Sequence, residues 1–95
     1  MYAFKEIQAK VRGIAGTLPI SRVTLVGSYA KNTATDQSDI DLVVDGQDLS
    51  DAYWDLLFQL EDAFIAKIDL LTAKGVKNSV LNSNIMEGGI VLYEA

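Results

Sequence analysis

The sequence predicts an α/β (α+β) fold in which a small mixed sheet of about four strands is flanked by about three helices. We expect one domain that covers residues 1–95. Short apolar runs of strand length alternate along the chain with segments whose apolar residues recur at helical spacing. Hydrophobic residues make up 49% of the chain and charged residues 22%, which is typical of a globular domain.

The first third of the chain is expected to form a helix, a strand and a turn. Apolar residues recur at helical spacing over residues 2–16, and Pro19 prevents the helix from continuing. Residues 23–26 are uniformly apolar or β-branched and predict a buried strand. Residues 28–35 then predict a helical turn followed by a loop.

The middle of the chain carries the clearest helix. Residues 39–45 predict a strand, which the turn Asp45-Gly46 closes. Residues 49–65 predict a helix with Asp48 as its N-cap. One side of this helix is expected to face the core, and its residues are Leu49, Tyr53, Leu56, Leu57, Leu60 and Phe64.

The last third is expected to contain a strand, a helix and a strand. Residues 67–72 predict the third strand, followed by a turn at Lys74-Gly75. Residues 76–87 predict a helix that ends at Gly88-Gly89, and residues 90–93 predict the final strand. The inward-facing residues of this helix are expected to be Val76, Val80, Leu81 and Ile85.

The composition of the chain excludes several classes of functional site and partner. The chain has no Cys and no His, which excludes disulfides, thiol nucleophiles and ordinary zinc sites. Its net charge of −5 argues against general nucleic-acid binding. No apolar run is long enough to span a membrane, and Lys5 and Glu6 interrupt the N-terminal segment, so we expect no signal peptide and a cytoplasmic location.

Two carboxylates occupy one side of the strand predicted at residues 39–45. Side chains alternate along a strand, so Asp39 and Asp41 point the same way, roughly 6.5 Å apart. No Lys or Arg lies between Lys31 and Lys67 to compensate them. A shared proton or a divalent cation would do so, and hard oxygen ligands favour Mg²⁺ or Mn²⁺. Asp69, in the next apolar run, is a candidate third ligand.

A possible phosphate site precedes these carboxylates. Gly27 and Ser28 follow the strand at residues 23–26, and a helical turn that starts there directs backbone N–H groups at an anion. A Gly-Ser pair alone is usually only a turn, and one Asp-x-Asp can simply cap a turn or face solvent. The joint pattern is more specific, since a phosphate cradle followed by paired carboxylates suits phosphoryl or nucleotidyl transfer.

The segment from Gly27-Ser28-x-Ala30-Lys31 through Ser38-Asp39-Ile40-Asp41-Leu42 resembles the signature of the minimal nucleotidyltransferases, which belong to the DNA polymerase beta-like superfamily. Ile68-Asp69-Leu70 and the C-terminal segment also look like this family, so the resemblance runs over essentially the whole chain. It implies a palm-like mixed sheet, ATP, Mg²⁺ and AMP transfer. Members are commonly antitoxins paired with a HEPN-domain ribonuclease toxin, whose tyrosine hydroxyl accepts the AMP.

The resemblance also implies residue roles. Gly27 and Ser28 would hold the triphosphate of the nucleotide, with Lys31 as a phosphate-binding cation. Asp39 and Asp41 would bind both metal ions. Asp69 would bind the catalytic metal and help to deprotonate the attacking hydroxyl.

Two departures from the family pattern leave a second function open. The family usually has Arg and Gly where this chain has Lys31 and Asn32; Asn tolerates a left-handed backbone better than other non-Gly residues. The alternative is a catalytically weak or inactive antitoxin that neutralises its partner by direct binding. A nucleotide-binding subunit of a larger enzyme is a third possibility.

The helix at residues 49–65 also carries apolar residues opposite its core side, namely Trp54, Phe58 and Ile65. Large apolar groups on an outer face are unusual in a small monomer. Another part of the chain could cover them. We favour a protein interface, with either a HEPN-type toxin or a second copy in a homo-oligomer.

Overall fold

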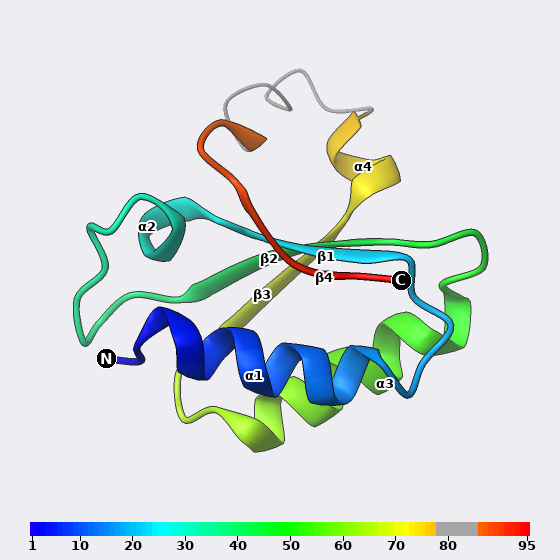
Figure 1. Ribbon diagram of the computed structural model, residues 1–95, viewed down its shortest axis with the longest axis horizontal. Helices are drawn as coiled ribbons and strands as arrows, with labels where there is room; N and C mark the ends of the chain where they lie inside the picture. Colours follow the sequence, from blue (N-terminus) through cyan, green and yellow to red (C-terminus); the bar gives the residue numbers. More distant parts are fainter. Residues whose placement is uncertain (78–85) are drawn as a thin grey trace.

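The fold is a four-stranded mixed sheet with helices on both faces, as predicted (Figure 1). The computed structural model describes residues 1–77 and 86–95. The strands are β1 (Arg22–Val26), β2 (Ile40–Asp45), β3 (Ile68–Thr72) and β4 (Ile90–Glu94). The helices are α1 (Phe4–Ala15), α2 (Gly27–Ala30), α3 (Ser50–Ala63) and α4 (Ala73–Lys77).

The sheet has the spatial order β3-β2-β1-β4. β1 pairs antiparallel with both β2 and β4, whereas β2 and β3 are parallel. A parallel pair needs a long crossover connection, and α3 supplies it. The two strands that carry the predicted carboxylates are therefore direct neighbours.

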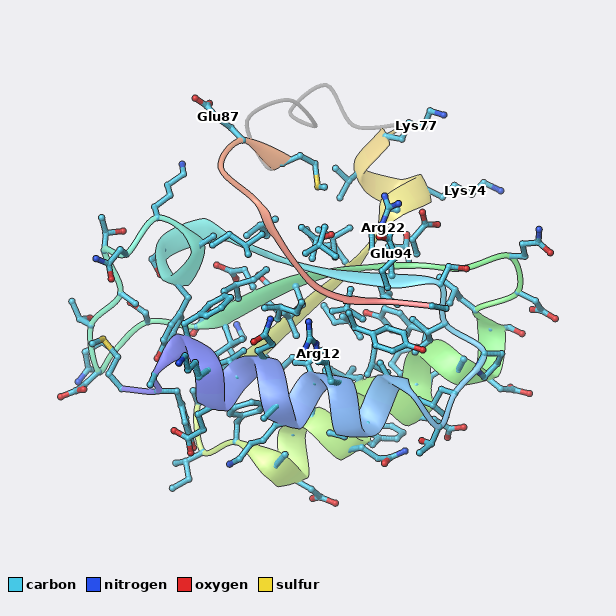
Figure 2. The ribbon with its side chains drawn as sticks, in the orientation of Figure 1. Arg12, Arg22, Lys74, Lys77, Glu87 and Glu94 are labelled. Carbon is cyan, nitrogen blue, oxygen red and sulfur yellow. The ribbon has the colours of Figure 1, made fainter. Side chains whose placement is uncertain are left out.

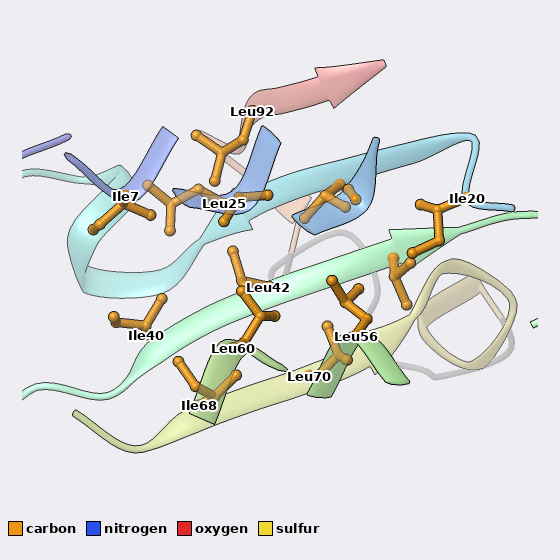
Figure 3. Packing of buried hydrophobic residues seen from close by; sticks show 14 of the residues in the cluster. Ile7, Ile20, Leu25, Ile40, Leu42, Leu56, Leu60, Ile68, Leu70 and Leu92 are labelled. Carbon is orange, nitrogen blue, oxygen red and sulfur yellow. The ribbon is translucent and has the colours of Figure 1, made fainter. Parts of the chain in front are cut away.

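Helices α1 and α3 lie together against one face of the sheet, and α4 lies on the other side (Figure 1). The main core fills the space between the sheet and the α1/α3 layer (Figure 3). It includes Ile7 and Val11 of α1, Leu42 of β2, and Leu56 and Leu60 of α3, all without exposed surface. In these helices the buried residues follow the helical spacing expected from the sequence.

The other face of the sheet is covered less completely. A smaller buried cluster there joins Val26 of β1, Val43 of β2 and Val76 of α4. Figure 2 shows Lys74, Lys77 and Glu87 on this side of the sheet, away from α1 and α3. We call it the open face, and it is the face on which the predicted carboxylates lie.

The ends of α3 differ from the prediction. Leu49 occupies the N-cap position without a side-chain cap bond, so the prediction of Asp48 as N-cap is wrong. The Asp48 carboxylate instead accepts a hydrogen bond from the Ser50 hydroxyl at 3.1 Å. The helix ends at Ala63, and Phe64 has an extended backbone. Ile65, 99% exposed, therefore lies beyond the helix rather than in register with Trp54 and Phe58.

The predicted turn at Lys74-Gly75 is also wrong, because α4 begins directly after β3. The Thr72 hydroxyl accepts a hydrogen bond from the Gly75 N–H at 3.0 Å, which satisfies a free donor of the first helical turn. Val76 is buried as expected. Val80, Leu81 and Ile85 lie outside the described residues.

Most of the helix predicted over residues 76–87 lies outside the described residues. Gly88 has a φ of +73°, the left-handed conformation in which glycine commonly ends a helix. In the two described ranges, no helix is both long and apolar enough to span a bilayer.

Candidate active site

Asp41 and Asp69 lie side by side on the open face. In the parallel pairing of β2 and β3, Asp41 is the direct register partner of Asp69. Their strand neighbours Leu42 and Leu70 are buried in the main core, so alternation turns both carboxylates to the opposite side. The pairing therefore brings together two carboxylates that are far apart in the sequence.

Asp39 lies one residue before the start of β2 and is half-buried. Its charge acts on the Asp41 carboxylate. The structure thus places Asp39 and Asp69 each within electrostatic reach of Asp41.

This arrangement disfavours the charged form of Asp41. Partial burial, followed by the charges of Asp69 and Asp39 and a hydrogen bond with Asp69, raises the pKa of Asp41 from its ordinary value of 3.8 to about 6. Lys67 opposes the increase. A carboxyl group in this position gains from a cation that offsets the repulsion.

The donor set suits Mg²⁺ shared with a nucleotide. No group of three or more acidic, His or Cys side chains in the described ranges is already arranged to hold a metal ion. Magnesium sites, however, commonly use one or two carboxylates together with substrate phosphates and water. Asp41 and Asp69 supply such a pair, and Asp39 adds a third charge beside it.

Gly27 is required at its position for two independent reasons. Its φ is +71°, a conformation that L-residues with a side chain rarely adopt. A Cβ atom there would also overlap Oδ2 of Asp41. Val26, its predecessor, pairs with Asp41 in the β1–β2 register, which explains the close approach. Because Gly27 has no side chain, the predicted phosphate loop can lie directly against Asp41 of the carboxylate pair.

Ser28, Lys31 and Asn32 complete this loop. Ser28 lies in the single turn of α2, and its carbonyl oxygen accepts a hydrogen bond from the Thr33 N–H at 2.9 Å. Lys31 caps α2 and is exposed. Asn32 has a φ of +59°, so the left-handed turn survives without a glycine. The side chain of Lys31 approaches Gly88, so the loop lies close to the segment that leads into β4.

Lys67 is a site residue that the sequence analysis did not single out. It directly precedes β3, two residues before Asp69, and therefore shares its face by alternation. Its carbonyl oxygen accepts a hydrogen bond from the Ile40 N–H at 2.9 Å. The spacing to Asp69 was the available signal, but only the pairing of β3 with β2 brings this cation near Asp41.

Comparison with known proteins agrees with this arrangement. The family model described as "Polymerase beta, Nucleotidyltransferase" matches residues 10–95. The Methanocaldococcus jannaschii protein "Putative protein adenylyltransferase MJ1379" is 32% identical over 88 residues, which are 87% of this chain and 88% of that protein. "Putative protein adenylyltransferase MJ0435" of the same organism is 31% identical over 84% of this chain and 92% of its own.

Two solved structures have the same fold. A mutant of the toxin-antitoxin MntA-HpeT superposes with a TM-score of 0.70 at 23% identity and covers 99% of this chain and 75% of that chain. A toxin-antitoxin with AMP-PNP has a TM-score of 0.67 at 25% identity, over 96% of this chain and 73% of that chain. The chain therefore belongs to the polymerase beta nucleotidyltransferase family, which confirms the nucleotidyltransferase predicted from the resemblance to its minimal members.

Proposed function

We propose that this chain is an Mg²⁺-dependent adenylyltransferase that transfers AMP from ATP to a protein hydroxyl, the tyrosine of a partner HEPN-type toxin, in the cytoplasm. The observation that carries the proposal is the Asp41–Asp69 pair beside Gly27. Two further findings support it: the relatives named protein adenylyltransferases, and the structural neighbour that holds AMP-PNP, a non-hydrolysable ATP analogue, within a toxin-antitoxin.

The reaction exchanges one phosphorus–oxygen bond for another. The acceptor oxygen forms a bond to the α-phosphorus of ATP, the bond from that phosphorus to the β-phosphate oxygen breaks, and pyrophosphate leaves. The acceptor proton passes to a carboxylate, for which Asp69 is the exposed member of the pair. Bound Mg²⁺ would neutralise the charge that develops on the phosphate oxygens.

The chain's own residues orient these groups. Asp41 and Asp69 would hold the ion from adjacent strands, with Asp39 next to them. The backbone at Gly27 and Ser28 would bind the triphosphate. Because Gly27 has no side chain, this backbone can lie directly beside Asp41. Lys31 supplies a flexible positive charge for the phosphates.

The test is the intact mass of both proteins after this chain is mixed with Mg²⁺, ATP and a candidate HEPN-type partner protein. We expect the partner to gain one or more AMP units, and Asp41→Asn to abolish the gain. Asp45→Asn, which removes an exposed carboxylate from the other end of β2, is the matched control and should transfer normally. A partner that is bound and silenced but unmodified would instead support an antitoxin that acts by masking.

A further inference from the structure

The outward side of α3 carries two exposed aromatic side chains in contact with each other. Trp54 is 54% exposed and Phe58 is 58% exposed, and their ring centroids are 6.1 Å apart. Trp54 also packs edge-to-face against Tyr53, whose hydroxyl donates a hydrogen bond to the Leu70 carbonyl oxygen at 2.6 Å. We call Trp54 and Phe58 the α3 patch, and its Trp54 packs against a side chain that is hydrogen-bonded to the sheet.

Carboxylates surround the patch. At 100° per residue, Asp51, Asp55 and Asp62 lie on one side of the two aromatic residues and Glu61 lies on the other. These four acidic residues are all exposed. The helix contains no Lys or Arg, and none occurs anywhere between Lys31 and Lys67. Within α3, the patch is thus an apolar centre whose charged neighbours are all acidic, and the basic Lys10 of α1 reaches only the end of the helix, at the Ala63 carbonyl oxygen.

This charge pattern distinguishes between a second copy of the chain and a different protein as the molecule that binds the α3 patch. A symmetric homodimer through the same surface would place acidic rim against acidic rim, with no basic residue of α3 to offset the repulsion. A surface with an apolar pocket and a border of Lys or Arg complements both features. We propose that the α3 patch docks a partner protein through such a pocket; that this partner is also the AMP acceptor rests on the proposed function.

The docking surface is separate from the carboxylates. α3 lies against the face of the sheet opposite the open face (Figure 1). A partner held on α3 leaves Asp41, Asp69 and Gly27 accessible to the nucleotide. Docking therefore raises the effective concentration of the acceptor without occupying the transfer site.

Site-specific photocrosslinking of the full chain in its source cells tests the proposal. The photoreactive analogue p-benzoyl-phenylalanine replaces Phe58, and the control replaces Phe4, an exposed phenylalanine of α1. Mass spectrometry of the adducts identifies the crosslinked peptides. We expect an adduct from position 58, and not from position 4, with another protein at a site where apolar residues are bordered by Lys or Arg.

Two variants examine the two parts of the surface. Trp54→Ala and Asp55→Lys should each lower the adduct yield at least about tenfold. Glu87→Lys, a charge reversal on the other side of the sheet, should leave it unchanged (Figure 2). An adduct between two copies of this chain, no adduct at position 58, or a yield that Trp54→Ala does not lower would each overturn the proposal.

The same samples separate this inference from the proposed function. Asp41→Asn should abolish AMP transfer and retain the crosslink from position 58. A crosslink to a partner that never acquires AMP would refute the proposed function and leave the docking surface standing. AMP transfer without that crosslink would refute the docking surface alone.

Discussion

Replacing Asp41 by Asn should stabilise the metal-free protein while it abolishes transfer. Asn keeps the shape of the side chain and removes the charge that burial, Asp69 and Asp39 disfavour. The pKa of Asp41 rises from 3.8 to about 6, and each pKa unit corresponds to about 1.36 kcal/mol. The upper bound is therefore about 3 kcal/mol, and because Asp41 is only half-buried, solvent screening reduces the expected gain to about 1 kcal/mol.

The sign of the pH dependence follows from the raised pKa. Between pH 3.8 and about 6 the folded protein retains a proton that the unfolded chain has lost. The contribution of Asp41 to stability is thus fully present below pH 3.8 and is lost as the pH rises through about 6. The gain from Asp41→Asn should vanish near pH 4, grow as the pH rises toward 6 and be complete above about pH 6.

Thermal unfolding in EDTA at several pH values measures this difference, and Asp62→Asn is the matched control. In a domain of this size, about 1 kcal/mol corresponds to an increase in Tm of about 4–8 °C. Adding Mg²⁺ with an ATP analogue should raise the Tm of the wild type more than that of Asp41→Asn. This account of the carboxylate cluster would be refuted if Asp41→Asn were less stable than the wild type at neutral pH. It would also be refuted if the Tm difference between the two proteins were the same at pH 4 as at neutral pH.

Substitutions at three further positions test other parts of the structure. Gly27→Ala should lower the free energy of unfolding by about 1–2 kcal/mol or more in urea titrations, because of its left-handed backbone and the overlap with Asp41; unchanged stability would contradict the described turn. Lys31→Ala should weaken ATP binding about tenfold in calorimetry, and Lys31→Arg should retain the wild-type affinity. If Lys31→Ala binds ATP as tightly as the wild type, Lys31 does not belong to the phosphate site. Leu56→Ala should destabilise the fold by about 2–5 kcal/mol in the same titrations, since Leu56 has no exposed surface, and a loss below about 1 kcal/mol would be inconsistent with its burial.

Local patterns in the sequence predicted most elements because helices and strands have characteristic apolar periods. Two of the errors at described positions arose where short polar segments offered competing local bonds. Asp48 bonds to the Ser50 hydroxyl instead of capping α3, and Thr72 caps a helix where Lys74-Gly75 suggested a turn. The apolar periodicity also predicted that α3 extends beyond Ala63, and it therefore placed Ile65 on the same side as the two residues of the α3 patch. In the structure the helix ends at Ala63.

The sequence by itself determined the chemistry of the site: which residues are carboxylates, that Asp39 and Asp41 share one side of a strand, and that a glycine precedes them. These features are local, because they depend only on alternation and spacing along one segment. Tertiary structure decided that β3 pairs in parallel with β2, which places Asp69 beside Asp41 and brings Lys67 near it. A shift of one residue in that register would turn Asp69 into the core, and only contacts between residues far apart in the sequence fix the register.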